Sequence, residues 1–251
     1  MCQCHALSRR RFLTAGAAAS TTLLAGCDEV RVPNLVSEAQ VQAMGLQAWE
    51  EIRSSTPLSR SNGLVAAVNE VAARCIRAAG DDPADWDVAL FAVAEVNAFA
   101  LPGKRIGVFE GMLAVAEDAD QLAAVIGHEI GHVQARHSQE RISAELAQQY
   151  GLRVIQFLLH LGNVEFADSI AAALGVGVQF GLILPYSRRQ ELEADRLGID
   201  IMRVASFDPA AALTLWQRMD AMAGERPPGF LSTHPAPATR IEKIQEILSS
   251  T

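Results

Sequence analysis

Two histidines four residues apart, His128 and His132, constrain the fold most, because they stand within a largely apolar run. The run from Asp118 to His137 predicts one amphipathic helix, on which residues four apart share a face. Burying imidazoles and a carboxylate among apolar side chains is costly unless these groups have a role. Two neutral imidazoles on one face suit Zn²⁺, and Glu129 beside them is placed to act as a general base.

Glu191 is the candidate for the third protein ligand that a catalytic zinc ion usually has. It shares a helix face with Asp195, four residues later, so Glu191 can bind the metal while Asp195 orients a ligand histidine through its free ring N–H. Glu193 points about 200° away and is expected to be solvated. Nine residues of straight helix would carry His137 to the face opposite His128, so we expect it to be a solvent-facing or packing histidine.

Both motifs resemble those of a known family. The stretches H-E-I-G-H-V-Q-A-R-H from His128 and S-R-R-Q-E-L-E-A-D-R-L-G from Ser187 closely resemble the HtpX/Oma-type gluzincin metallopeptidases, family 48 of the metallopeptidases. The resemblance runs from about Asn97 to His234 and implies a zincin-type domain with one Zn²⁺ per chain. The roles that it implies are zinc ligation by His128, His132 and Glu191, catalysis by Glu129, and orientation of a ligand by Asp195.

Three short β-forming runs, at residues 86–93, 95–101 and 105–109, predict a small sheet beside this helix. The middle run contains Asn97, Ala98 and Phe99, and it resembles the family's strand beside the active site. The resemblance implies that these residues bind peptide substrate as an added strand through backbone hydrogen bonds. An ordinary hairpin that supports the core is the alternative.

His234 lies in the segment S-T-H-P, which resembles a family segment near the metal, within a Pro- and Gly-rich stretch, 224–237, that predicts a loop. As a catalytic residue, His234 would donate a hydrogen bond to the developing oxyanion. It would otherwise take the fourth position on zinc and hold the enzyme latent, or be an ordinary loop histidine.

The N-terminal stretch, 1–26, resembles a twin-arginine lipoprotein signal peptide. The sequence S-R-R-R-F-L at 8–13 precedes a weakly apolar region too short to span a membrane comfortably. The sequence L-A-G-C then resembles a lipobox, which predicts cleavage before Cys27 and lipidation of that residue; an uncleaved anchor is the alternative. We therefore expect 27–36 to be a lipidated tether in a bacterial envelope, facing the periplasm, with Asp28 slightly favouring the inner membrane.

Charge limits the classes of partner that the chain can bind, and the cysteine content limits its disulfides. Without the three signal arginines, the mature chain has 18 basic and 29 acidic residues, a formal charge of −11. This argues against nucleic acid, so we expect unfolded or misassembled envelope proteins as substrates and attachment to the membrane through Cys27. Cys75 would be the one other cysteine left, which excludes an intramolecular disulfide if Cys27 carries lipid. The sequence leaves the oligomeric state open.

The remaining pattern predicts a mainly α fold with a small β-sheet (α+β), in which 37–251 form a single zinc metallopeptidase domain and the H-E-x-x-H helix packs beside a short antiparallel or mixed sheet. Ser37 and Gln40 predict a capping box at the start of the first helix. The run Ile170 to Leu184 predicts a buried or lid-like helix, or one that dips into the bilayer surface. We expect nearby His160 to be a packing residue. The predicted helices span about 37–55, 58–79, two stretches within 140–184, 188–205, 208–222 and 238–248.

These features predict a zinc metalloendopeptidase that hydrolyses internal peptide bonds, with envelope protein quality control as its setting. A zinc-binding periplasmic chaperone or adaptor with latent proteolytic activity is the main alternative. A prenyl-protein protease ranks lower because the sequence offers no multi-span membrane chamber. In the remaining alternative, a non-enzymatic structural lipoprotein, no metal would be bound.

Overall fold

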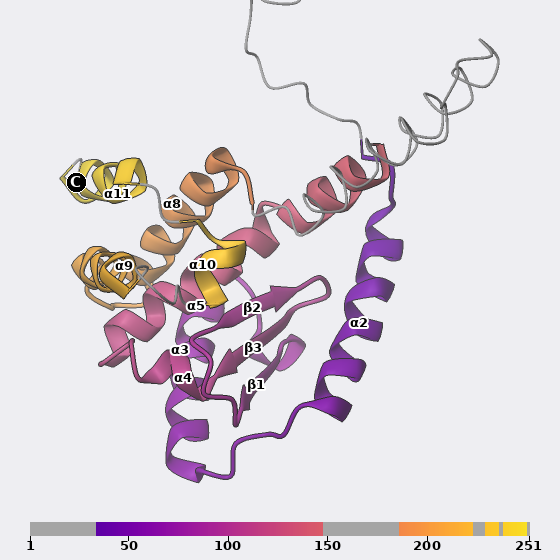
Figure 1. Ribbon diagram of the computed structural model, residues 1–251, viewed down its shortest axis with the longest axis horizontal. Coiled ribbons are helices and arrows are strands. Elements are labelled where there is room, and N and C mark those ends of the chain that lie inside the picture. Colours follow the sequence, from indigo (N-terminus) through magenta and orange to yellow (C-terminus); the bar gives the residue numbers. More distant parts are fainter. Residues whose placement is uncertain (1–33, 148–185, 223–228, 236–237, 250–251) are drawn as a thin grey trace, which may run out of the picture. The chain divides into compact units, whose positions relative to one another are not determined.

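The computed structural model describes residues 34–147, 186–222, 229–235 and 238–249 (Figure 1). The predicted signal peptide with Cys27, most of the tether, and the apolar stretch with His160 lie outside the described residues. Within the described ranges, no helix combines the length and the apolar character needed to cross a membrane. The described part is mainly helical with one small sheet, which confirms the predicted α+β class.

The sheet has three strands, β1 (Asp87–Phe91), β2 (Ala98–Leu101) and β3 (Arg105–Phe109), in the order β1-β3-β2. β1 runs parallel to β3 and β2 antiparallel to it, so the sheet is mixed and β2 lies at one edge. The turn between β2 and β3 needs two left-handed residues, which Gly103 (φ 84°) and Lys104 (φ 66°) supply. The three predicted β runs are confirmed.

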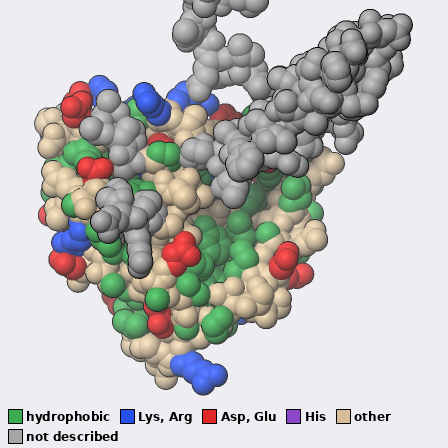
Figure 2. Space-filling view, viewed as in Figure 1, with side chains coloured by type: hydrophobic (Ala, Val, Ile, Leu, Met, Phe, Trp, Pro, Cys, Tyr) green, Lys and Arg blue, Asp and Glu red, His purple; other side chains and the backbone are tan. Residues whose placement is uncertain are grey.

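One face of the sheet carries aromatic side chains and is partly covered by helix α2 (Glu38–Ser55) (Figure 1). The predicted capping box of this helix is confirmed. Trp49 of α2 packs edge-on against Phe91 and Phe99. Figure 2 shows apolar side chains gathered over this face between the strands and α2.

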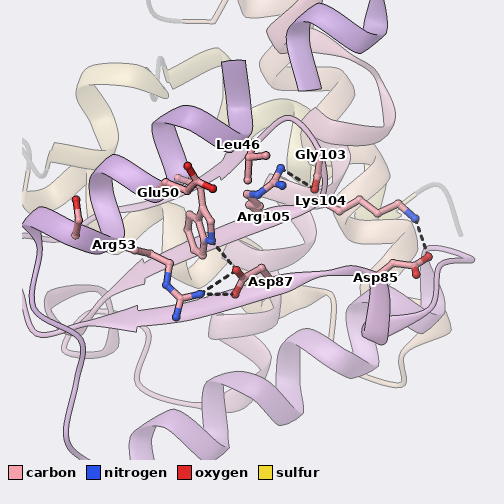
Figure 3. Close-up of a pocket in the computed structure, with 10 residues that line it drawn as sticks. Leu46, Glu50, Arg53, Asp85, Asp87, Gly103, Lys104 and Arg105 are labelled. Atoms are coloured by element: carbon pink, nitrogen blue, oxygen red, sulfur yellow. Dashed lines mark hydrogen bonds and ion pairs between the residues drawn. The ribbon is translucent and has the colours of Figure 1, made fainter. Parts of the chain in front are cut away.

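Polar contacts also attach α2 to the sheet. The Trp49 indole N–H donates to Asp87 Oδ2 (2.6 Å), and Arg53 Nη1 donates to the same carboxylate (2.9 Å) (Figure 3). An open pocket of about 530 Å³ lies beside these contacts, and the residues lining it include Lys104 and Arg105. None of the candidate site residues lines this pocket, so it belongs to the junction between α2 and the sheet.

The main core lies among the helices, with α5 (Ala119–Gln134) at its centre. α5 packs against α3 (Asn62–Ala78), α8 (Arg188–Val204), α9 (Ala210–Met222) and β2. The C-terminal helix α11 (Ala238–Ser249) packs on α8 and α9. The structure also has three short helices, which are η1 (Pro83–Asp85), α4 (Glu110–Leu113) and α10 (Gly229–Thr233).

α5 and α8 approach each other closely because three glycines lie where they cross. A Cβ on Gly198 of α8 would stand 2.8 Å from the backbone nitrogen of His128, closer than real Cβ atoms come. On α5, a Cβ on Gly127 would stand 3.1 Å from the Gly198 carbonyl oxygen, and one on Gly131 would stand 2.9 Å from that of Ala194. Since α5 and α8 carry most of the candidate site, these glycines set the distance between the candidate ligands.

Three predicted boundaries are wrong. The helix expected over 118–137 ends at Gln134, and Arg136 takes a left-handed conformation (φ 57°). The helix expected from residue 58 begins at Asn62, because Leu58 instead forms a β-bridge with Phe91. The stretch expected to be a loop contains α10, whose Phe230 is fully buried against the core.

Candidate metal centre

His128, Glu129 and His132 lie on α5 and are almost completely buried. The Asp118 side chain caps this helix by accepting from the backbone N–H of Gln121 (2.7 Å). The 3.6-residue turn of the helix brings the two imidazoles together, with 3.0 Å between their Nε2 atoms. The shared helix face predicted for the two histidines is therefore present.

Glu191 reaches the same point from α8, where it lies in the first turn behind the capping box of Ser187 and Gln190. Its Oε1 is 3.4 Å from His132 Nε2, and its Oε2 is 3.6 Å from His128 Nε2. The structure thus brings together the two histidines and the glutamate that the sequence separates by 59 residues or more.

His234 completes the cluster. It follows α10, and its Nδ1 lies 3.0 Å from Glu191 Oε1 and 3.2 Å from His128 Nε2. One potential ligand atom from each of His128, His132, Glu191 and His234 falls within 4.8 Å of all the others. Of the roles considered for His234, an ordinary loop histidine does not match this position.

Polar groups orient two of the histidines from behind. Asp195 Oδ1 lies 3.0 Å from His128 Nδ1, close enough to orient the ring, and Arg240 Nη2 lies 3.2 Å from the same nitrogen. His137 Nδ1 lies 2.9 Å from His132 Nδ1, and its other ring nitrogen is 3.4 Å from Glu193. Glu193 is itself exposed, as expected.

The face predicted for His137 is wrong. The helix break at Ala135 and Arg136 turns the chain back, so His137 is buried against His132 instead of lying on the opposite side of a straight helix. Its packing role is present, but the solvent-facing alternative is not.

Glu129 lies between the cluster and the sheet. Its Oε2 accepts a hydrogen bond from the backbone N–H of Ala100 on β2 (2.7 Å), and its Oε1 lies 3.4 Å from His234 Nε2. Burial, partly offset by neighbouring charges, raises the pKa of the Glu129 carboxyl to about 7. A carboxyl with such a pKa can both take up and release a proton near neutral pH.

Burial keeps the cluster histidines in the form that binds metals. It lowers the pKa values of His128, His132 and His234, so their rings are neutral at neutral pH. Burial alone would raise the pKa of Glu191, but the guanidinium of Arg240 and the hydrogen bonds from the histidines outweigh it and hold the pKa well below its usual range. The donor set is therefore three neutral imidazoles and one carboxylate.

This donor set fits one zinc ion. Imidazole nitrogens and a carboxylate oxygen are ordinary zinc ligands. Glu129 Oε1 is a buried oxygen that accepts no hydrogen bond from the described residues, which is costly without a cation. Glu191 Oε2 also accepts none, but the Arg240 guanidinium lies beside it as an ion pair. With its three buried carboxylates ionised and its one buried guanidinium, the centre carries a formal charge of −2, which a divalent ion neutralises. The residues that contribute these charges are Glu129, Glu191, Asp195 and Arg240.

The prediction from sequence missed Arg240. This residue lies on α11, fully buried, with its guanidinium against Asp195 and Glu191. One signal in the sequence pointed to it. Arg240 stands four residues before Ile244, on the stripe of the last predicted helix that also bears Ile241, Ile247 and Leu248, and a charged residue on an apolar stripe needs a partner.

The free edge of β2 faces α5. The backbone N–H of Phe109 donates to the Asn97 carbonyl (3.0 Å), so alternation along the antiparallel ladder directs the backbone of Asn97 and Phe99 toward β3. The same alternation directs the backbone groups of Ala98 and Ala100 outward, in agreement with the bond from Ala100 to Glu129. Among the described strands, none pairs with this edge.

An H-E-x-x-H helix beside a small mixed sheet, with a glutamate from a second helix at the two histidines, defines a zincin-type metallopeptidase domain. The sequence matches the profile of Peptidase family M48 over residues 63–248. The chain belongs to this family, which confirms the resemblance seen in the sequence.

Several relatives are similar over most of this chain. The mitochondrial metalloendopeptidase OMA1 of Schizosaccharomyces pombe is 40% identical over 183 residues, which are 72% of this chain and 52% of that protein. The beta-barrel assembly-enhancing protease of Escherichia coli K12 is 29% identical over 215 residues, 82% of this chain and 43% of that protein. Human mitochondrial metalloendopeptidase OMA1 is 30% identical over 242 residues, 91% of this chain and 44% of that protein. This chain thus spans about half or less of the length of these relatives.

Proposed function

We propose that this chain is a zinc-dependent metalloendopeptidase that hydrolyses internal peptide bonds of proteins. The observation that carries the proposal is the convergence of His128, His132 and Glu191 around one point, with Glu129 beside them. Membership of peptidase family M48 supports it, as do the relatives named metalloendopeptidases. Because those relatives are longer, the activity of this chain requires its own test.

His128, His132 and Glu191 would hold the zinc ion. Bound there, zinc would polarise the scissile carbonyl and acidify the attacking water. Glu129 would take the proton from that water and pass it to the leaving amine, a task suited to a carboxyl whose pKa is about 7. Asp195 would hold the His128 ring in the tautomer that presents Nε2 to the metal.

The edge of β2 would hold the peptide. Ala98 and Ala100 direct their backbone groups outward. Because the Ala100 N–H donates to Glu129, an extended substrate would pair as an added strand with the Ala98 N–H and with the carbonyls of Ala98 and Ala100, independently of its side chains. Asn97 and Phe99 would contribute by holding β2 in register with β3. A pocket of about 140 Å³ beside His132, lined also by Pro102 and Val133, lies where β2 ends and offers space for a substrate side chain.

For His234, the geometry favours the role of a fourth ligand that holds the enzyme latent. Its Nδ1 lies among the ligand atoms, whereas an oxyanion donor would leave that position to the substrate. In this proposal His234 moves away before substrate binds. His234→Ala should then raise the rate of cleavage; a fall of tenfold or more would support the oxyanion role instead.

We further propose misassembled or unfolded envelope proteins as substrates. The name of the E. coli relative, a beta-barrel assembly-enhancing protease, supports this setting. So do the twin-arginine-type signal at 1–26 and the lipobox before Cys27, with 27–36 as a lipidated tether, 37–251 as the catalytic domain, and Asp28 slightly favouring the inner membrane. Mass analysis of the mature N-terminus, with Cys27→Ser as the control, tests the lipid anchor.

The deciding experiment measures bound metal and cleavage of casein on the same samples of wild type and Glu129→Gln. Glu129→Gln keeps the ligands and removes the base, so both proteins should bind about one zinc and only wild type should cleave. If both bind zinc and neither cleaves, His234→Ala is the next variant. A wild type and a His234→Ala variant that bind zinc without cleaving would refute the peptidase and favour the chaperone or adaptor. Absence of bound zinc in wild type would refute the metal centre itself.

A further inference from the structure

Arg240 is the one buried guanidinium at the metal centre among the described residues, and carboxylates surround it. Its Nε donates to Asp195 Oδ2 (2.5 Å) and its Nη2 to Asp195 Oδ1 (2.6 Å), which makes a two-pronged pair. Its Nη1 lies 2.5 Å from Glu191 Oε2, close enough for an ion pair although the two groups are not aligned as a hydrogen bond. The flat side of the guanidinium stacks on Trp216, 3.5 Å from the ring centre.

These contacts connect Arg240 to two candidate ligands by separate routes. The first route is direct, since Arg240 holds Glu191 Oε2 while Oε1 turns toward His132 and His234. The second route leads to His128, both through Asp195, whose Oδ1 lies beside the Arg240 donor and the His128 ring nitrogen, and directly, since Arg240 Nη2 lies 3.2 Å from His128 Nδ1. A single side chain on the C-terminal helix therefore bears on groups from both α5 and α8.

We propose that Arg240 is a positioning residue of the metal centre, which fixes the Glu191 carboxylate and the Asp195–His128 pair in the orientation that binds zinc. The inference rests on the ligands named under the proposed function, but not on cleavage of any substrate. Holding Oε2 fixes the Glu191 carboxylate so that Oε1 faces His132 and His234. Holding both oxygens of Asp195 sets the plane of the carboxylate that receives the His128 N–H.

The planar fork of arginine is essential to this role. A lysine at residue 240 would bring one point charge and would not grip Asp195 with two parallel donors while also reaching Glu191. A glutamine would keep polar atoms but lose both the charge and the second prong. Arginine should therefore order the two carboxylates best, lysine less well, and glutamine least.

The test measures zinc affinity of the full chain by competition with a chelator, together with the melting temperature of the metal-free protein. Arg240→Gln should weaken zinc binding about 10- to 100-fold, and Arg240→Lys should weaken it less. Arg218→Gln is the matched control. Arg218 also makes three close polar contacts, to Val115, Gln121 and Glu117, but none to a candidate ligand. This control should lower the melting temperature and leave zinc affinity within about twofold of wild type.

A double-variant comparison separates positioning from general loosening. If Arg240 acts partly through Asp195, Arg240→Gln should cost less zinc affinity in an Asp195→Asn background than in wild type. Unchanged zinc affinity in Arg240→Gln would overturn the proposal, as would an equal loss in Arg218→Gln or full additivity with Asp195→Asn. If Arg240→Gln does not fold, Arg240→Lys carries the same comparison.

The wild-type control keeps this inference separate from the proposed function. A wild type and a His234→Ala variant that both bind zinc without cleaving casein would refute the peptidase and leave the effect of Arg240 on zinc affinity measurable. A wild type that binds no zinc would overturn both.

Discussion

Gly198→Ala should weaken zinc binding without changing any ligand side chain, because Gly198 lies where α8 crosses α5. The added Cβ would stand 2.8 Å from the His128 backbone nitrogen, and ordinary contact begins at 3.4 Å. The two helices must therefore separate by about 0.6 Å, or α8 must tilt. Zinc sites tolerate about 0.2 Å in ligand distance, and Glu191 lies on the helix that moves.

Two effects of Gly198→Ala on the free energy of unfolding oppose each other. Overpacking typically costs about 1–3 kcal/mol in free energy of unfolding, while alanine in place of glycine favours a helix by about 1 kcal/mol. The metal-free protein should thus lose about 0–2 kcal/mol, whereas zinc affinity should fall about tenfold or more. The assay pairs chelator competition with chemical unfolding of the metal-free chain.

Gly63→Ala is the matched control. Gly63 also lies in a helix, α3, but a Cβ there would meet nothing within 4 Å. This variant should be neutral or stabilised by up to about 1 kcal/mol, with zinc affinity unchanged. If Gly198→Ala bound zinc as tightly as Gly63→Ala, the claim that the helix crossing sets the ligand spacing would be refuted.

Three further predictions concern stability. Asp118→Ala should cost about 1 kcal/mol in thermal unfolding, because the backbone N–H of Gln121 loses its cap; an unchanged melting temperature would contradict this. Arg136→Gly should stabilise the fold by up to about 1 kcal/mol, because glycine relieves the left-handed backbone (φ 57°). Arg136→Val should destabilise the fold. Both variants lose the surface ion pair with Glu38, so the difference between them reports the backbone effect. Cys75 is buried, which raises its pKa to about 12, so peptide mass mapping at pH 8 should find it alkylated only under unfolding conditions; labelling of the native chain would show that the core opens.

Local patterns in the sequence predicted much of the fold. The capping box at Ser37, the three β runs and the helix pair carrying His128 and Glu191 follow from spacing and polarity within a few residues of each other. The helix break at Arg136 did not, because the surrounding residues suit a helix and arginine rarely takes a left-handed conformation. Tertiary contact decided that boundary, and the position of His137 with it.

The candidate site was predictable only in part. His128, His132 and Glu191 belong to motifs with helical spacing, and helix geometry places each on a definite face. Arg240 depends on how α11 docks onto α8 and α9, which no local pattern specifies. The outward direction of the Ala98 and Ala100 backbone likewise follows from strand register, and register is a property of the assembled sheet.

The cluster of His128, His132, Glu191 and His234 has a mechanical consequence. Glu191 lies 59 residues beyond His132, and His234 lies 43 residues beyond Glu191, so one bound ion closes two long loops of chain. A disulfide closing a loop of comparable length would contribute about 4 kcal/mol by restricting the unfolded chain. The described residues contain one cysteine, Cys75, so no disulfide can form among them. Zinc would then serve as the cross-link of the domain, and a chelator would loosen the fold as well as the site.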